Sequence, residues 1–211
     1  MGLDHLYDCP DKQEARDRIY SHLMAEAPGP LMFFPGPRRW EIDTALRHGF
    51  PLDKMIPVEK SRGILAALRK MCARSYGAGH PRLALPPCHA ATLAIVCRGI
   101  PRGSVRAVNF DFCTSIEPLG EDSTRDDLER FFFSGAMESG SLSVELYQGR
   151  CKGFAGMEQR LAQLFAVIKR CHGGLVVPIE HGTYQNSRSH ASTSMLWSVY
   201  RLEKTKRRDV K

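Results

Sequence analysis

The stretch LMFFPGPRRWEI, from Leu31 to Ile42, joins a short apolar run to a charged, helix-like segment through Pro-Gly-Pro. Four consecutive apolar residues are typical of a strand that is buried on both faces of a sheet. Gly36 carries no side chain, so the backbone can turn there and approach another group closely. A helix that begins near Arg39 would direct its free N–H groups at the same turn. We therefore expect a strand, a sharp turn and a helix, and the turn is either a structural corner or one side of a ligand site.

Helices and strands are predicted in alternation along the chain. The expected helices are Asp11–Ala27, Arg39–His48, Ser61–Ser75, Ala90–Arg98, Ser123–Met137 and Gly156–His172, and the expected strands are Leu31–Phe34, Met55–Val58, Leu83–Leu85, Val105–Phe112, Ser141–Tyr147, Leu175–Ile179 and Met195–Leu202. Alternation of this kind is typical of an α/β protein whose mostly parallel central sheet has helices on both faces. The last two strands follow each other without a helix, so we expect a C-terminal antiparallel strand pair.

The length and composition favour one globular domain. With 211 residues, 43% of them hydrophobic and 25% charged, the chain can form one sizeable core but is short for two. We expect a single domain over residues 1–211, with residues 1–28 as an N-terminal helix extension and residues 204–211 as a basic tail. Eighteen consecutive apolar residues do not occur, and the N-terminus lacks the pattern of a secretory signal. We therefore expect a cytoplasmic protein without a membrane partner.

The cysteines and the net charge narrow the class of protein further. The seven cysteines are odd in number and contain no C-x-x-C pair, which favours reduced thiols over a disulfide framework. Cys88-His89 and Cys171-His172 repeat a pair, but four ligands at zinc-like spacing do not occur, so we predict no metal. The formal net charge of +7, partly from the tail LEKTKRRDVK, favours an acidic partner and most commonly nucleic acid. The alternative is a solvated basic tail without a partner.

Two candidate ligand-binding positions follow the first two expected strands, at carboxyl ends where open α/β sheets bind ligands. Glu59 lies 23 residues beyond Gly36 (59 − 36). An acid about 20 residues after a glycine turn is the usual position of the carboxylate that binds ribose hydroxyls. The chain has a single glycine instead of G-x-G-x-x-G, so a plain strand-to-helix turn is the alternative for Gly36. For Glu59 the alternative is a surface ion pair with Lys60 or Arg62.

The third candidate is the segment VNFDFCTS, at the end of a strand that we expect to be central. Asn109 and Asp111 alternate there with Phe110 and Phe112. A carboxylate at the end of a buried strand is costly unless it binds something. Asp111 could accept a hydrogen bond from a substrate amine or a cofactor ammonium, and Phe112 could stack on a planar group. The alternative is that Asp111 caps the next turn.

The strand–PGP–helix unit, the segment VEK, the segment VNFDFC and the terminal strand–loop–strand follow one another between Leu31 and Leu202. Together they resemble the class I S-adenosylmethionine-dependent methyltransferases, and more narrowly the small phage- and mobile-element-type methyltransferase-like proteins. The resemblance implies a Rossmann-like fold with S-adenosyl-L-methionine as cofactor. The cofactor-binding residues that it implies are Phe34, Pro35, Gly36, Pro37, Glu59, Lys60 and Asn109, and the catalytic residues are Asp111, Asn109 and Phe112. In this resemblance the turn at Gly36 lies beside the methionine part of the cofactor, and Glu59 holds the ribose.

The chain departs from the family's pattern at two motifs. The first motif of the family usually carries an acid and two or three glycines, whereas this chain has FFPGPRRWE. The fourth motif of the amino-methylating DNA enzymes reads (D/N/S)PP(Y/F), whereas this chain has NFDF without prolines. Phe112-Cys113 also differs from the Pro-Cys pair of cytosine-C5 enzymes. These departures leave open a protein that keeps the fold for binding and has lost catalysis.

The polar segment HGTYQNSRSHASTS, over His181–Ser194, is expected to form a long loop between the last two strands. Long loops in compact domains are often functional. Tyr184, Arg188 and His190 could contact a phosphate or a base of a nucleic-acid substrate, with Tyr184 stacking on the base. The alternative is a solvated loop without a ligand.

The sequence therefore predicts an S-adenosylmethionine-dependent methyltransferase-like protein that acts on or binds nucleic acid. Asp111 is the expected proton acceptor where the methyl acceptor must lose a proton. The alternative from another class is a non-catalytic binding or scaffold protein that keeps a degenerate methyltransferase fold. An NAD-type oxidoreductase would share the sheet, but it would require the G-x-G-x-x-G pattern that this chain lacks.

Overall fold

The computed structural model describes residues 10–36, 39–59, 61–76, 92–112, 124–147, 154–186 and 193–204. The helices are α1 (Pro10–Glu26), α2 (Trp40–Arg47), η2 (Leu52–Lys54, a 3-10 helix), α3 (Arg62–Tyr76), α4 (Thr92–Arg98), α5 (Thr124–Ser134) and α6 (Phe154–His172). The strands are β1 (Leu31–Phe33), β2 (Met55–Pro57), β3 (Ala107–Asp111), β4 (Gly140–Tyr147), β5 (Leu175–Asn186) and β6 (Thr193–Glu203). The expected strand at Leu83–Leu85 lies outside the described residues. The other expected helices and strands are present. The strand expected at Val105–Phe112 and the helix expected at Ser123–Met137 are shorter than predicted, and the last two strands are longer.

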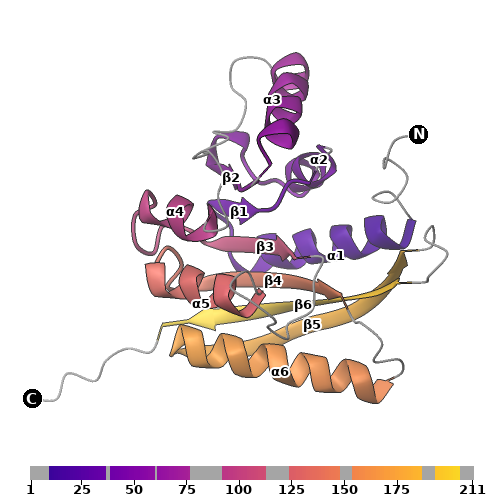
Figure 1. Ribbon diagram of the computed structural model, residues 1–211, viewed down its shortest axis with the longest axis vertical. Helices are drawn as coiled ribbons and strands as arrows, with labels where there is room; N and C mark the ends of the chain where they lie inside the picture. Colours follow the sequence, from indigo (N-terminus) through magenta and orange to yellow (C-terminus); the bar gives the residue numbers. More distant parts are fainter. Residues whose placement is uncertain are drawn as a thin grey trace, which may run out of the picture.

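The described strands form one sheet in the order β2-β1-β3-β4-β6-β5 (Figure 1). β1 pairs in parallel with both β2 and β3, and β3 pairs in parallel with β4. β6 is antiparallel to both β4 and β5. This topology confirms the predicted mostly parallel sheet with a C-terminal antiparallel pair. Because β1 lies between β2 and β3, the strand order reverses beside β1, which is where open α/β sheets bind their ligands.

Two apolar cores lie on opposite faces of the sheet, because successive side chains of a strand point to opposite faces. In β1, Met32 packs in the core that α4, α5 and α6 cover. Leu31 and Phe33 pack in the core that α1 and α2 cover, together with Cys72 of α3. All three residues of β1 are buried, as the apolar run predicted. Helices therefore cover both faces of the sheet (Figure 1).

The last two strands are longer than the sequence predicted. β5 continues to Asn186 and β6 begins at Thr193, so most of the segment that we expected to be a loop is paired strand. Its polar residues occupy the outer face, where His181 and Thr183 are exposed, whereas Tyr184 is buried. The loop prediction is wrong because a strand with one solvated face needs polar residues at every second position.

Local signals at two helix ends agree with the sequence. The hydroxyl of Ser61 accepts a hydrogen bond from Ile64 N–H over 3.3 Å, which caps α3 as expected. Gly173 follows α6 with a left-handed φ of 67°, and its N–H donates to Lys169 O over 3.2 Å. Glycine tolerates this conformation better than any other residue, so it ends α6.

The cysteines of the described residues are free thiols, at Cys72, Cys97 and Cys171. Burial raises the pKa of the Cys97 thiol to about 11, which keeps this thiol protonated at neutral pH. In the described part of the chain, three or more His, Cys, Asp or Glu side chains do not gather where a metal ion could bind. None of the helices described above combines the length and the apolar composition that a membrane span requires.

Candidate functional site

The carboxyl ends of β2, β1 and β3 lie next to one another at one edge of the sheet. Phe33, at the end of β1, pairs with Pro57 of β2 and with Asn109 of β3. Backbone hydrogen bonds join the strands at this edge. Val58 N–H donates to Phe33 O over 2.8 Å, and Phe34 N–H donates to Asn109 O over 3.3 Å. The segments that follow the three strands therefore leave the sheet side by side, where the strand order reverses.

The turn after β1 is open at Gly36. This residue has a left-handed φ of 63°, and a Cβ placed on it would meet no atom within 4 Å. The backbone conformation favours glycine, and the space beside it lets another group approach the backbone. Phe34 and Pro35 precede it in the same turn, whereas Pro37 lies outside the described residues.

Glu59 is held at the end of β2 by the first turn of α3. Its Oε1 accepts a hydrogen bond from Ser61 N–H over 2.8 Å, and the residue is half-buried. This bond fixes the direction of the carboxylate, and a fixed direction favours the binding of ribose hydroxyls. Lys60 lies outside the described residues, so its role stays a prediction.

An aromatic cluster connects the turn after β1 with the end of β3. Phe34 stacks on Phe110 with ring centroids 4.8 Å apart, and Phe112 meets the Phe34 ring edge-on at 5.4 Å. Phe110 is fully buried, whereas Phe34 and Phe112 are half-buried. The ring of Phe112 therefore packs in the protein's own core, and the expected stacking on a planar ligand stays a prediction.

Asn109 and Asp111 point to the opposite face of the sheet, beneath α1. Lys12 Nζ lies 2.6 Å from Asp111 Oδ2, and it also lies 5.8 Å from the centre of the Tyr184 ring. The Tyr184 hydroxyl donates to Glu145 Oε2 over 3.0 Å, and Asn109 Nδ2 donates to Glu145 Oε1 over 3.4 Å. These contacts join α1, β3, β4 and β5 in one buried polar cluster, which we call the α1 network.

The α1 network continues along the helix to α2. Arg16 Nε donates to Glu41 Oε1, and the Tyr20 hydroxyl donates to Glu41 Oε2 over 2.8 Å. Asn109 Nδ2 lies 3.4 Å from the same Oε2, so this amide connects the Glu41 and Glu145 carboxylates. Because these side chains are buried, their hydrogen bonds offset the cost of removing them from water.

The α1 network contains more acidic than basic side chains. It has the three carboxyl groups of Glu41, Asp111 and Glu145 but only the two cations Lys12 and Arg16. Burial, and next the negative charge of Asp111, raise the pKa of Glu145 to about 7. Burial by itself lowers the pKa of the Arg16 guanidinium, because it disfavours the charged form. The adjacent Glu41 carboxylate stabilises the charged form more strongly, so the pKa is raised. A protonated Glu145 would leave two carboxylates against two cations.

The structure brings three of the predicted site residues together on the face of the sheet that α1 covers. Asn109, Asp111 and Tyr184 meet in the α1 network. Tyr184 lies in β5 and is only 4% exposed. The predicted stacking of Tyr184 on a base is therefore corrected, because both faces of its ring are covered. Arg188 and His190 lie outside the described residues.

Sequence reasoning missed the contribution of α1. Lys12, Arg16 and Tyr20 are spaced by four residues, so they form one row along the helix. A row with two cations on the buried face of a helix indicates buried acidic partners. This signal was available in the sequence, although the identity of the partners Glu41 and Glu145 was not.

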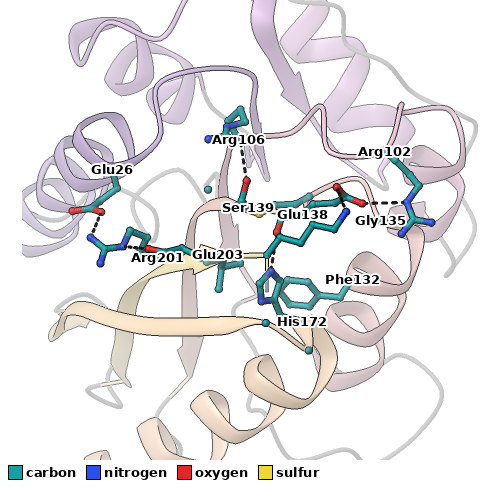
Figure 2. Close-up of a pocket in the computed structure, with 16 residues that line it drawn as sticks. Glu26, Arg102, Arg106, Phe132, Gly135, Glu138, Ser139, His172, Arg201 and Glu203 are labelled. Atoms are coloured by element: carbon teal, nitrogen blue, oxygen red, sulfur yellow. Dashed lines mark hydrogen bonds and ion pairs between the residues drawn. The ribbon is translucent and has the colours of Figure 1, made fainter. Parts of the chain in front are cut away.

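A hollow of about 1110 Å³ lies at the opposite edge of the sheet (Figure 2). It is lined by the start of β4 at Gly140, the end of β6 at Glu203 and the end of α6 at His172. This edge of the sheet holds the amino ends of the parallel strands, such as Gly140 of β4, whereas Glu59 follows the carboxyl end of β2. The hollow is therefore separate from the candidate ligand edge.

Most charged side chains around this hollow pair with one another, as Figure 2 shows. Glu138 lies 2.8 Å from Lys204 and 3.5 Å from Arg102, and the hydrogen bond from Lys204 lowers the pKa of Glu138. Arg201 lies 3.4 Å from Glu26. Cations that are already paired offer little attraction to an anion, so we do not assign a ligand to the hollow.

Neither a family model nor a curated protein sequence matches this chain. Several solved structures are similar. One is a proposed RNA methyltransferase from Pyrococcus horikoshii. The aligned region covers 96% of this chain and 90% of the neighbour's chain, with 12% identity and a TM-score of 0.59. Another is TYW2 of M. jannaschii, crystallised in complex with AdoMet. The aligned region covers 93% of this chain and 78% of the TYW2 chain, with 9% identity and a TM-score of 0.55. A proposed transferase from P. horikoshii matches 94% of this chain at 13% identity, with a TM-score of 0.58.

Several of the similar structures are methyltransferases or proposed methyltransferases, and TYW2 was crystallised with AdoMet. At such low identity the similarity establishes the fold, which is the Rossmann-like fold of these methyltransferases. The chain spans 65% of the length of the P. horikoshii transferase, which is less than two thirds.

Proposed function

We propose that this protein binds S-adenosyl-L-methionine at the carboxyl edge of β2, β1 and β3 and transfers its methyl group to nucleic acid. The proposal depends mainly on one observation: the open turn at Gly36 and the oriented carboxylate of Glu59 follow neighbouring strands where the strand order reverses. The complex of TYW2 with AdoMet supports the cofactor. The net charge of +7 and the similarity to a proposed RNA methyltransferase support the acceptor.

Each residue of the edge has a role in this proposal. Glu59 accepts hydrogen bonds from the ribose hydroxyls, and the backbone at Gly36 lies beside the methionine part. The half-buried rings of Phe34 and Phe112 provide an apolar wall next to that turn. The bound cofactor supplies an activated methyl group, so the protein mainly has to align the acceptor and exclude water.

In the same proposal Asp111 accepts a proton from the methyl acceptor, and its ion pair with Lys12 orients the carboxylate. Asn109 is buried, so in this proposal it has an indirect role. Its hydrogen bond to Glu145 holds the end of β3 in place. The carboxylate of Asp111 would then be supported from α1, which makes α1 part of the site's framework.

A non-catalytic binding protein is the second candidate function. The observation that favours it is the engagement of Asn109 and Asp111 in the α1 network, because buried polar networks also serve purely to specify packing. In that case the fold would bind nucleic acid, with or without the cofactor, and no methyl group would be transferred.

Asp111→Asn separates the two candidates. The amide keeps the shape of the carboxylate but has little basicity, so we expect methyl transfer to fall at least about a hundredfold, the lower end for general bases. Transfer of a radiolabelled methyl group from S-adenosylmethionine to cellular RNA and DNA measures it, and calorimetry checks that cofactor binding persists. Transfer at an unchanged rate would remove Asp111 from the mechanism, and no transfer by the wild type to either acceptor would favour the binding protein.

Glu59→Ala should weaken the binding of S-adenosylmethionine and S-adenosylhomocysteine about tenfold or more, the scale of one charge-assisted hydrogen bond. Calorimetric titration measures this loss. Glu203→Ala, which removes an exposed carboxylate at the opposite edge of the sheet, is the matched control and should bind as the wild type does. Equal affinities of the two variants would show that Glu59 does not hold the ribose.

Three narrower predictions stay predictions. The assignment to phage and mobile-element proteins gains no support from the structural neighbours, so the proposal does not include it. A cytoplasmic location and the organisation as one domain over residues 1–211, with residues 1–28 as an extension and residues 204–211 as a basic tail, are likewise kept as predictions.

A further inference from the structure

Helix α3 concentrates positive charge. Its sequence, RGILAALRKMCARSY, contains the four cations Arg62, Arg69, Lys70 and Arg74 and no acid. The helix therefore contributes +4 to a chain with a formal net charge of +7. By contrast, α5 combines three acids with two arginines, and α1, α2 and α6 also contain acids.

The cations occupy the side of α3 that faces away from the protein. Leu65, Leu68 and Cys72 are buried, and their spacing of three and four residues fixes the rotation of the helix. All four cationic residues are exposed. With a rise of 1.5 Å per residue, Arg62 and Arg74 are about 18 Å apart along the axis, which is the rise of about five base pairs.

The exposed side of α3 is otherwise made of small residues, among them Ala66, Ala67 and Ala73. A helix that binds a membrane surface presents large apolar side chains beside its cations. A protein-binding surface usually presents aromatic anchors. In the described residues the exposed large hydrophobic side chains are Phe133 and Leu175, which belong to α5 and β5. The face of α3 thus has the chemistry that phosphate groups require and lacks that of a membrane or protein contact.

The position of α3 connects this face with the candidate ligand edge. α3 lies beyond β2, the terminal strand of the described sheet, at one end of the molecule (Figure 1). It begins at Arg62, three residues after Glu59. We propose that the exposed face of α3 binds the phosphate backbone of a nucleic acid and guides that strand past the edge at Gly36 and Glu59.

This inference rests on the proposed function for one point, that the bound nucleic acid is the methyl acceptor. The binding itself needs no cofactor. It also provides a nucleic-acid contact in place of Tyr184, whose ring is covered. The two proposals can therefore be tested, and can fail, separately.

The test is fluorescence anisotropy with a fluorescein-labelled RNA hairpin and a DNA duplex of the same sequence, over a range of salt concentrations. The variant is Lys70→Glu/Arg74→Glu, at the end of α3 away from Glu59. At about 0.1 M salt we expect its Kd to rise at least about tenfold. We expect the slope of log K against log salt to shrink by about two, because two phosphate contacts are lost.

The matched control is Arg130→Glu/Lys169→Glu, which makes the same change in net charge on exposed positions of α5 and α6. Those helices cover the other face of the sheet, so screening should keep the loss of affinity below about threefold. Circular dichroism and melting curves confirm that both variants are folded. Equal losses in the two variants, or no loss in the α3 variant, would overturn the inference.

Two further measurements complete the test. Binding of the wild type to phosphatidylserine vesicles but to neither nucleic acid would also overturn the inference. Calorimetry should show that the α3 variant still binds S-adenosylmethionine. A wild type that binds nucleic acid through α3 but gives no heat with the cofactor would refute the proposed function and leave this inference standing. Cofactor binding without nucleic-acid binding would refute this inference and the nucleic-acid acceptor, and it would leave the cofactor site of the proposed function standing.

Discussion

Arg16→Met is expected to lower the free energy of unfolding by about 3–5 kcal/mol, the usual cost of leaving a buried charge without its partner. Arg16 and Glu41 are 4% and 5% exposed, and Arg16 Nε donates directly to Glu41 Oε1. Methionine keeps an apolar stem of similar length, so the main loss is the charge. Within the described residues, the Glu41 carboxylate then keeps the hydrogen bonds from Tyr20 and Asn109. For a chain of this length the melting temperature should fall by roughly 10 °C.

Two further variants distinguish the stability that the buried ion pair contributes from the stability that packing contributes. The double variant Arg16→Met/Glu41→Gln removes both charges and keeps an acceptor for the Tyr20 hydroxyl, so it should recover at least about half of the loss. Arg125→Met breaks an exposed pair with Glu129, 3.0 Å long, and should cost about 0.5 kcal/mol or less. Urea unfolding measures all three. Similar losses for the Arg16 and Arg125 variants would contradict the view that a buried ion pair fixes α1 to the sheet.

The arrangement of strands was accessible from the sequence because it depends on local patterns. A short apolar run such as Leu31–Phe33 predicts a strand buried on both faces, and Gly173 predicts the end of α6. The spacing between Gly36 and Glu59 then follows from one strand–helix–strand unit. These residues act through their own conformation or their immediate neighbours, so the sequence contains the necessary information.

The α1 network was not accessible in the same way, because its partners are distant in the sequence. Lys12 and Asp111 are 99 residues apart, and only the packing of α1 across the sheet brings them together. The direction of Asp111 could have been predicted, since Phe110 and Phe112 occupy the other face of β3. The length of β5 was missed for a different reason. The polar side chains at His181 and Thr183 were interpreted as a loop, although they mark the exposed face of a strand.

Glu145 should make the stability of the protein depend on pH between about 5 and 7. Burial, and then the charge of Asp111, raise its pKa from the ordinary value of 4.5 to about 7. In this window the folded protein keeps a proton on Glu145 that the unfolded chain has released. Unfolding therefore releases a proton, and the free energy of unfolding falls as the pH rises through this window. The shift corresponds to a loss of roughly 3 kcal/mol between pH 4.5 and pH 7.

Glu145→Gln should remove most of this dependence, because glutamine has the shape of a protonated glutamic acid and does not titrate. Urea unfolding of the two proteins should give nearly equal stabilities at about pH 5 and a variant that is more stable by roughly 3 kcal/mol at about pH 8. Glu138→Gln is the control. The hydrogen bond from Lys204 lowers the pKa of Glu138, so any stability that this group contributes is lost only below the window. This control should keep the slope of the wild type.

The titration of Glu145 should also affect the proposed site, because Glu145 lies beside the end of β3. Asp111 and Glu145 are register partners on neighbouring strands, and Lys12 pairs with Asp111. When Glu145 loses its proton, a second carboxylate competes for the Lys12 ammonium, and the hold of α1 on the end of β3 weakens. Hydrogen exchange in α1 and β3 should therefore accelerate between about pH 6 and pH 8 in the wild type and stay constant, after correction for the intrinsic rate, in Glu145→Gln. Equal acceleration in both proteins would mean that Glu145 does not control the docking of α1.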